Sequence, residues 1–122
     1  MRRLTVSEVD ISVEAISEDM PPEDFFDIDC DKICAEIREE DSQGNYLAWC
    51  GIRVVARWEG FEGSDTLGGC SFLWRYSPGG DEYAARDACV EDNGMIDLAI
   101  DDLMRQVEAA ALALDGLSGG AI

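Results

Sequence analysis

The chain has 122 residues and carries 27 acidic against nine basic side chains, a formal net charge of −18 at pH 7, with no histidine. Its 47% hydrophobic content suits one folded domain with a core of its own and excludes a disordered acidic tail. The charge disfavours binding to nucleic acid and to anionic membranes, and the lack of histidine excludes imidazole-based nucleophile activation and imidazole metal sites.

The first third of the chain predicts one strand followed by one helix. Val9, Ile11 and Val13 alternate with polar residues, which is the period of a half-buried strand. Pro21 and the acids that follow it indicate a helical turn, and Asp29 is a candidate cap for a longer helix. That helix is predicted from apolar residues at helical spacing: Cys30, Ile33, Cys34 and Ile37.

The middle of the chain predicts a β-hairpin. Its first strand is the alternating, β-branched and aromatic run Tyr46–Trp58, and its second strand is Cys70–Tyr76. The glycine-containing segment Gly60–Asp65 is predicted to form the turn between them. On this pattern the even-numbered positions of both strands face the helices.

The last third of the chain predicts a second helix. Residues 77–92 are ambiguous between a short helix and irregular structure, and residues 117–122 are expected to form a flexible tail. Between them Asn93 is a candidate N-cap, and the helix ends at Gly116. The apolar stripe of this helix consists of Ile96, Ile100, Leu103, Val107, Ala110 and Leu114.

These elements predict a single acidic α+β domain over residues 1–116. Its sheet is antiparallel or mixed and has three or more strands, in the order β-α-β-β-α, with two helices packed on one face. The opposite face carries a mixture of apolar and basic side chains: Leu47, Trp49, Arg53, Val55 and Leu73. Two alternatives stay open for it. Either the segment Tyr83–Val90 or the tail covers it, or it is a homodimer or partner interface.

Nothing in the sequence points to an enzyme, a cofactor or a metal site. A glycine-rich phosphate loop is missing, and no pair among the many carboxylates stands out as a catalytic pair. Four cysteines could surround zinc, but their spacing differs from Cys-x-x-Cys, and their apolar positions favour core packing: Cys30, Cys34, Cys50 and Cys70. The chain has no long apolar run and no signal-peptide pattern, which indicates a cytoplasmic protein.

The predicted helices carry like charges one turn apart. Asp97 with Asp101, and Glu36 with Glu40, each cost an isolated helix roughly 0.2 to 0.5 kcal/mol. A net charge of about 2 to 8 in magnitude is enough to keep a small domain soluble. Two explanations stay open: a solvated face kept highly charged, or carboxylates displayed on rigid elements in imitation of DNA phosphates.

Three short segments carry a resemblance to a known group of proteins. They are Ala48–Val54, Trp58–Gly63 and Leu67–Phe72, followed by the acidic helix opening Asp92–Met95. This pattern resembles small acidic proteins of unknown function that are encoded by phages, prophages and plasmids. The resemblance covers the middle and end of the chain and leaves residues 1–41 without a counterpart. It implies a mobile-element origin and no particular activity.

Charge and implied origin together lead to a hypothesis by analogy. The protein is expected to act in the cytoplasm of a bacterial host as an anti-CRISPR or antirestriction inhibitor. It would bind a basic surface of a host defence protein, a CRISPR effector or restriction nuclease subunit, without binding nucleic acid or membrane. The expected contact residues are Asp29, Asp31, Glu36, Glu39, Glu40, Asp97, Asp101, Asp102 and Glu108. The alternative is a protein-interaction or homodimerising module that docks through the Trp49 and Arg53 face.

Overall fold

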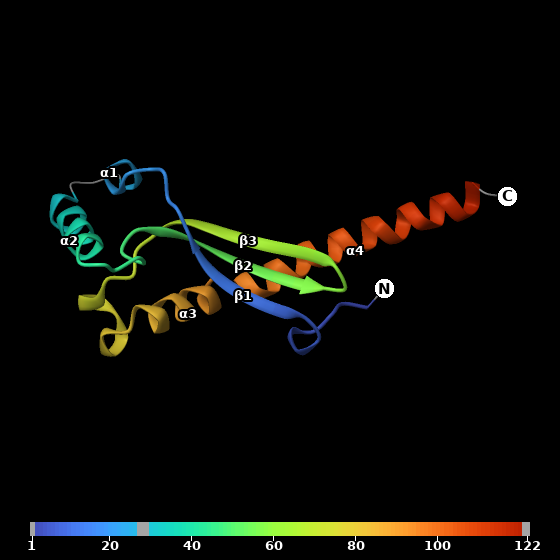
Figure 1. Cartoon of the computed structure of the whole chain (residues 1–122), viewed down its shortest axis with the longest axis horizontal. Helices are drawn as coiled ribbons and strands as arrows, with labels where there is room; N and C mark the ends of the chain where they lie inside the picture. The colour runs from blue at the N-terminus through green and yellow to red at the C-terminus, as the bar shows by residue number, and fades with distance from the viewer. Residues whose placement is uncertain (1, 27–29, 121–122) are drawn as a thin grey trace. The chain divides into compact units, whose positions relative to one another are not determined.

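The computed structural model describes the backbone of residues 2–26 and 30–120, and the side chains of residues 2–26 and 30–117. It has an α+β fold with a three-stranded antiparallel sheet, which confirms the predicted class. The strands are β1 (Asp10–Ile16), β2 (Cys50–Trp58) and β3 (Phe61–Cys70), with β2 in the centre (Figure 1). The helices within the described residues are α1 (Pro22–Phe25), α2 (Asp31–Ser42), α3 (Glu82–Asp92) and α4 (Met95–Gly120).

The hairpin lies earlier in the chain than its sequence predicts. Glu59 and Gly60 form the turn, with φ angles of 49° and 82°. Two consecutive positive φ values are typical of the two-residue type I′ turn, whose twist matches that of the flanking strands. The prediction of a turn at Gly60–Asp65 is therefore wrong. The predicted second strand, Cys70–Tyr76, is wrong as well, because β3 ends at Cys70 and a short 3₁₀ helix spans Trp74–Tyr76.

The first strand of the hairpin also begins later than predicted. The amide of Leu47 donates to Asn45 Oδ1 at 3.0 Å, and the amide of Ala48 donates to the Asn45 carbonyl at 3.1 Å. These bonds hold a turn in place of the start of a strand. Tyr46 is consequently 83% exposed, although the alternation predicts it to face the core.

The helices are predicted better than the strands. Helix α2 agrees with its prediction, and its N-cap residue is Cys30. The predicted cap, Asp29, lies outside the described residues. The ambiguous segment 77–92 contains α3, whose first amides donate to the Asp81 carboxylate. Asn93 does not cap the last helix as predicted, since it ends α3 instead. Helix α4 continues past Gly116 to Gly120. No helix in the described ranges has the length and apolar character needed to cross a membrane.

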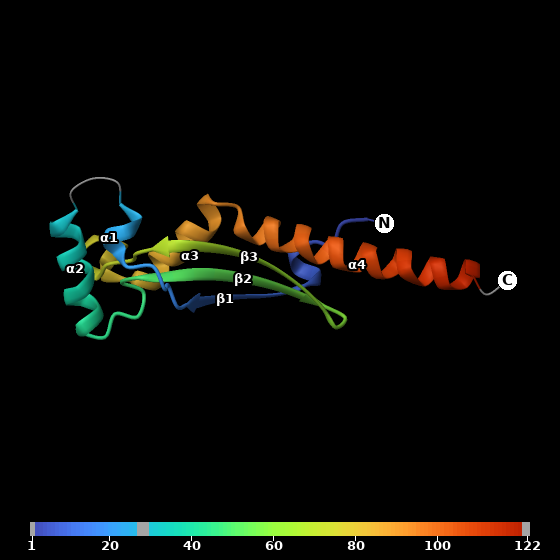
Figure 2. The ribbon, with the colours of Figure 1, turned by 90° about the horizontal axis from the view of Figure 1, so that it is seen from above.

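The chain forms two compact units, and each strand contributes residues to both. Unit 1 consists of Met1–Ser12, Val54–Asp65 and Gly94–Ile122, and unit 2 consists of Val13–Arg53 and Thr66–Asn93. In unit 2, α1 and α2 lie side by side (Figure 2). The prediction that two helices pack on one face stays a prediction, because α2 and α4 belong to different units.

In unit 1, α4 packs closely on the hairpin and then extends past its turn (Figures 1 and 2). A Cβ on Gly63 of β3 would lie 2.5 Å from the Ala99 carbonyl oxygen and closer still to the Leu103 backbone. Glycine is therefore what allows α4 to approach the strand this closely. Beyond the hairpin, the apolar side chains of α4 are exposed: Leu112, Leu114 and Leu117.

Candidate functional site

The acidic charge is unequally divided between the two units. Unit 2 contains 17 acidic and five basic residues, a net of 5 − 17 = −12, whereas unit 1 contains ten and four, a net of 4 − 10 = −6. Unit 2 is thus the stronger source of negative potential. A basic partner would be attracted to it first.

Three carboxylates on α2 converge on one arginine. Arg75 Nη1 lies 3.5 Å from Glu36 Oε1, and Arg75 Nη2 lies 3.2 Å from Glu39 Oε2. Arg75 Nε donates to Glu40 Oε2 at 2.9 Å. Arg75 belongs to the short 3₁₀ helix after β3, so these contacts tie that segment to α2. We call this group of four residues the Arg75 cluster.

Glu40 is the buried member of the Arg75 cluster, at 2% exposure. Its Oε1 accepts the Trp74 amide at 2.5 Å and the Asn45 side-chain amide at 3.0 Å. Burial by itself raises the pKa of Glu40, but the hydrogen bonds from Trp74, Asn45 and Arg75 outweigh it and hold the pKa below its ordinary value. Glu40 is therefore a structural carboxylate, and charge reversal there would break the fold.

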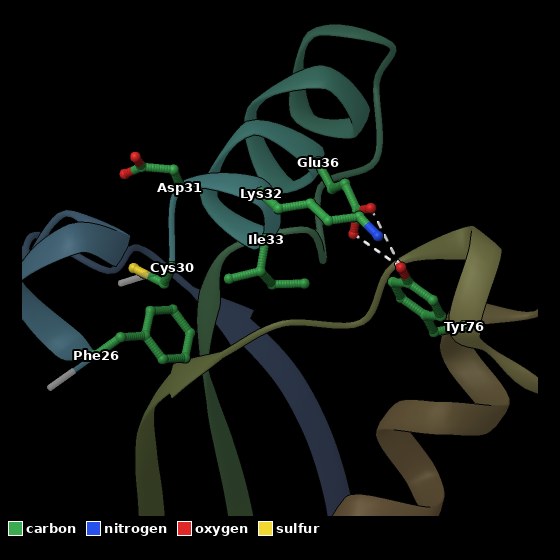
Figure 3. Close-up of a pocket in the computed structure, with 7 residues that line it drawn as sticks. All are labelled: Phe26, Cys30, Asp31, Lys32, Ile33, Glu36 and Tyr76. Atoms are coloured by element: carbon green, nitrogen blue, oxygen red, sulfur yellow. Dashed lines mark hydrogen bonds between the residues drawn. The ribbon is translucent and has the colours of Figure 1, made fainter. Parts of the chain in front are cut away.

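An open cavity of about 590 Å³ adjoins the Arg75 cluster (Figure 3). Phe26 and Ile33 form its apolar part, and Lys32 points toward its polar side, where the Tyr76 hydroxyl donates to Glu36 at 3.0 Å. That hydrogen bond is the main cause of a raised pKa at Tyr76. Cys30 also lines this cavity.

The predicted acids of α4 are grouped around other partners. Asp101 forms an ion pair with Arg3, and Asp97 lies 3.5 Å from the same guanidinium. Asp102 Oδ2 accepts the Ser64 amide of β3 at 2.9 Å, and this bond is the largest cause of its lowered pKa. Glu108 is exposed beside a cavity of about 320 Å³ that Arg3 and Asp101 also line.

The predicted contact set therefore divides into two kinds of residue. Glu36, Glu40 and Asp102 hold the fold together and are at least half-buried. The exposed side chains of the set are those of Asp31, Glu39, Asp97 and Glu108, and Asp101 is half-buried and paired with Arg3. Asp29 lies outside the described residues. The α2 members belong to unit 2 and the α4 members to unit 1.

Sequence reasoning missed a second group of carboxylates in unit 2. These side chains are exposed, and within the described residues the structure gives them no ion pair and no side-chain hydrogen bond: Asp19, Asp24, Asp41, Glu91 and Asp92. Their acidic neighbours, by contrast, have partners, as when Glu23 pairs with Arg38 and Glu18 accepts the Gly69 amide at 2.8 Å. A count of acids against nearby bases would have indicated such a surplus.

The alternative interface is largely covered. Leu47, Val55 and Leu73 are buried. Leu47 precedes β2 and Leu73 follows β3, where the predicted alternation does not hold, whereas Val55 is buried within β2. Leu73 packs with Ile37 of α2, so α2 covers this residue in place of the predicted segment or tail. Arg53 is half-buried and lies 3.7 Å from Glu14. Leu47, Val55 and Leu73 are therefore not accessible to a partner, and docking through Trp49 and Arg53 stays a prediction.

Trp49 is the exception in that set, since it belongs to an aromatic cluster. Its ring lies 5.4 Å from the ring of Phe25 and 6.2 Å from that of Phe26, centroid to centroid. Its Nε1 donates to the Met20 carbonyl at 2.8 Å. Met20, Phe25 and Phe26 are exposed although they are large and apolar. Together these four residues form the Trp49 patch, which the sequence did not reveal.

The described residues contain no group of three or more His, Cys, Asp or Glu side chains placed to hold a metal ion. Comparison of the chain with protein-family models, with curated proteins and with solved structures gives no match.

Proposed function

We propose that the protein is a non-enzymatic inhibitor that binds a basic, DNA-binding surface of a host nuclease complex in the bacterial cytoplasm. In this proposal it acts for a phage or another mobile element as an anti-CRISPR or antirestriction protein. Its exposed carboxylates take the place of DNA phosphates. The observation that carries the proposal is the surplus of exposed carboxylates without ion pairs in unit 2, whose net charge is −12.

This surplus is what separates a binding surface from an ordinary acidic one. Carboxylates that already pair with arginine gain little from a second cation, whereas unpaired carboxylates repel one another until a basic partner arrives. Several of them are held on ordered elements: Asp24 on α1, Asp41 on α2, and Glu91 and Asp92 on α3. The contact set that we propose therefore lies within unit 2 and combines these residues with Asp19 and the exposed acid Asp31 of α2. It omits Glu40 and Asp102.

Competition with DNA tests the proposal. The tagged protein captures its partner from a bacterial lysate at low salt, and a double-stranded DNA oligomer is then added in increasing amounts. We expect the DNA to displace the acidic protein, because both occupy the same basic surface. A partner that holds DNA and the acidic protein at the same time would contradict the proposal.

The Trp49 patch favours a second candidate function, a protein-interaction module that does not imitate DNA. Three exposed large apolar side chains around a tryptophan are typical of an interface centre. Ionic strength separates the two candidates. Binding through the Trp49 patch should be nearly indifferent to salt, whereas binding through carboxylates weakens as salt screens the charges.

A further inference from the structure

Two thiols meet at the beginning of α2. Cys30 Sγ and Cys34 Sγ lie 3.2 Å apart, and both cysteines are free. Cys30 is the N-cap residue of α2, and its carbonyl accepts the Cys34 amide at 2.9 Å. One helical turn therefore brings the two sulfurs into direct contact.

The two thiols differ in their access to solvent. Cys30 is half-buried and lines the cavity of about 590 Å³ that Phe26 and Ile33 also line (Figure 3). Cys34 is 2% exposed. A small oxidant in the cavity can therefore reach the Cys30 sulfur. The buried Cys34 sulfur contacts Cys30 and is oxidised by reacting with it.

The local backbone suits a disulfide. Residues four apart in a helix have Cα atoms about 6 Å apart, within the range that disulfides span. Cys30 has φ −126° and ψ 23°, outside the helical region, and its side chain makes no capping hydrogen bond. Closing the bond thus displaces no capping interaction and needs little movement within the helix.

The other three cysteines are in different surroundings. Burial raises the pKa of Cys50 to about 12 and that of Cys70 to about 11, and both thiols are buried. Cys89 is half-buried, with its sulfur 3.5 Å from Asn93 Nδ2, which donates to it. Cys89 is therefore a control for simple accessibility, and Cys50 and Cys70 are controls for a buried thiol.

We propose that Cys30 and Cys34 form an oxidisable dithiol, which hydrogen peroxide converts to an intramolecular disulfide. The Cys30 thiol gives its proton to solvent, and its sulfur attacks the peroxide and breaks the O–O bond, which leaves a sulfenic acid on Cys30. The hydroxide that leaves takes up that proton and becomes one water. The Cys34 sulfur then attacks the Cys30 sulfur and forms the S–S bond. The hydroxide that leaves takes the Cys34 proton and becomes a second water. Two thiols thus lose two electrons in total, and one peroxide gains them.

The order of these steps follows from the surroundings of Cys34. Burial first, and then the hydrogen bond to Cys30, raise the pKa of Cys34 to about 11. Cys34 accordingly remains a neutral thiol near neutral pH. Cys30 meets the oxidant, and Cys34 resolves the sulfenic acid.

Mass spectrometry tests the proposal on the intact chain. The folded protein is treated with hydrogen peroxide, its remaining thiols are alkylated in denaturant, and it is digested with trypsin without reductant. Because Lys32 lies between the two cysteines, cleavage after it separates Cys30 from Cys34. We expect the peptide ending at Lys32 to stay joined to the peptide Ile33–Arg38, and reductant to separate them.

Three variants distinguish this bond from general oxidation. Cys34→Ser should stop at the sulfenic acid on Cys30, which dimedone traps, and Cys30→Ser should leave Cys34 alkylatable. Cys89→Ser should form the linked peptides as the unchanged protein does. The proposal is overturned if Cys30 and Cys34 remain alkylatable after Cys89 has been oxidised, or if Cys30 is linked to another cysteine. If Cys34→Ser fails to fold, the digest of the unchanged protein still shows whether Cys30 and Cys34 are linked.

Discussion

The Arg75 Nε donates to Glu40 Oε2 across 2.9 Å, and this bond joins an exposed arginine to a buried carboxylate. Glu40 also accepts the Trp74 amide, so one side chain fixes two consecutive residues of the segment after β3 to α2. The acid run of α2 thus contains a residue that stabilises the fold, next to residues that are available to a partner. The first two predictions separate these roles.

Replacing Glu40 by alanine should destabilise the protein strongly. The substitution leaves the Trp74 amide without its acceptor inside the protein and removes one of the two acceptors of Asn45 Nδ2, the other being the Phe72 carbonyl, which together costs roughly 2 to 4 kcal/mol. Glu39→Ala is the matched control, because it removes the same side chain one position earlier, where it is exposed, and should change stability by about 0.5 kcal/mol or less. Urea unfolding measures both. Equal losses would contradict the structural role of Glu40.

Asp102 should contribute a pH-dependent part of the stability. Its pKa is lowered in the folded protein, chiefly by the Ser64 amide, so its contribution is present above the unfolded pKa of about 4 and is lost as pH falls through the folded pKa. Asp102→Asn keeps an oxygen that can accept the Ser64 amide but removes the titration. The variant should be less stable than the unchanged protein at neutral pH, and the difference should shrink below about pH 4.

That pH dependence is measured as the difference between the two proteins in unfolding free energy across pH 2.5 to 7. The comparison cancels the shared effect of the other carboxylates, whose protonation relieves repulsion. A difference that stays constant with pH would mean that the Asp102 carboxylate has the same pKa in the folded and unfolded chain.

The close approach of α4 to β3 predicts that replacing two different glycines by alanine changes stability in opposite directions. Gly63→Ala places a methyl group against the backbone of Ala99 and Leu103, which cannot yield as a side chain would, so we expect a loss of about 3 kcal/mol. Gly116→Ala meets no atom within 4 Å in α4 and should raise stability by about 0.5 to 1 kcal/mol. Thermal unfolding should move in opposite directions for the two variants. A tolerated Gly63→Ala would contradict the packing.

The proposed contact surface predicts that removing three negative charges from unit 2 weakens partner binding more than removing three from unit 1. Neutralising Asp19, Asp24 and Asp41 to asparagine should weaken partner binding about tenfold or more and reduce its salt dependence. The control neutralises three exposed acids of unit 1, Asp10→Asn, Glu59→Gln and Asp115→Asn, with the same change in net charge.

Binding is compared by titration at two ionic strengths. The control should keep most of its affinity, because its carboxylates lie outside the proposed surface. Equal losses in the two variants would mean that net charge alone attracts the partner, and no loss in either would favour the Trp49 patch.

Helix α2 was predictable because its apolar spacing agrees with its packing, whereas the segment of α3 was ambiguous and Leu114 of the predicted α4 stripe is exposed. Cys34 and Ile37 recur at the helical period and are buried in α2, as the pattern requires. The hairpin was not predictable from alternation. Gly63 and its polar neighbours have the composition of a turn, but they lie inside β3 because the α4 backbone needs the space. A tertiary contact therefore overrode a local preference.

Only the negative charge of the candidate site was predictable. Composition gives the net charge, but it does not show which carboxylates form ion pairs or hydrogen bonds within the protein. Glu39 and Glu40 are neighbours of the same type, yet one is exposed and the other is buried. The sequence did contain one signal for the Arg75 cluster. The spacing of Glu36, Glu39 and Glu40 places three acids on one side of a helix, where a single basic side chain can pair with all of them.

The strand order has a consequence for solubility. Because β2 is central, β1 and β3 are the edge strands of the sheet, and an edge strand can pair with a neighbouring chain. On β3 the Ser64 and Gly69 amides already donate to the side chains of Asp102 and Glu18, which limits such pairing. Acids along these two strands, Asp10 and Glu14 on β1 and Glu62 on β3, oppose such edge-to-edge association by mutual repulsion. Near the isoelectric point of about 4.1 that repulsion disappears, so acid conditions should favour aggregation along the sheet edges before other surfaces of the protein.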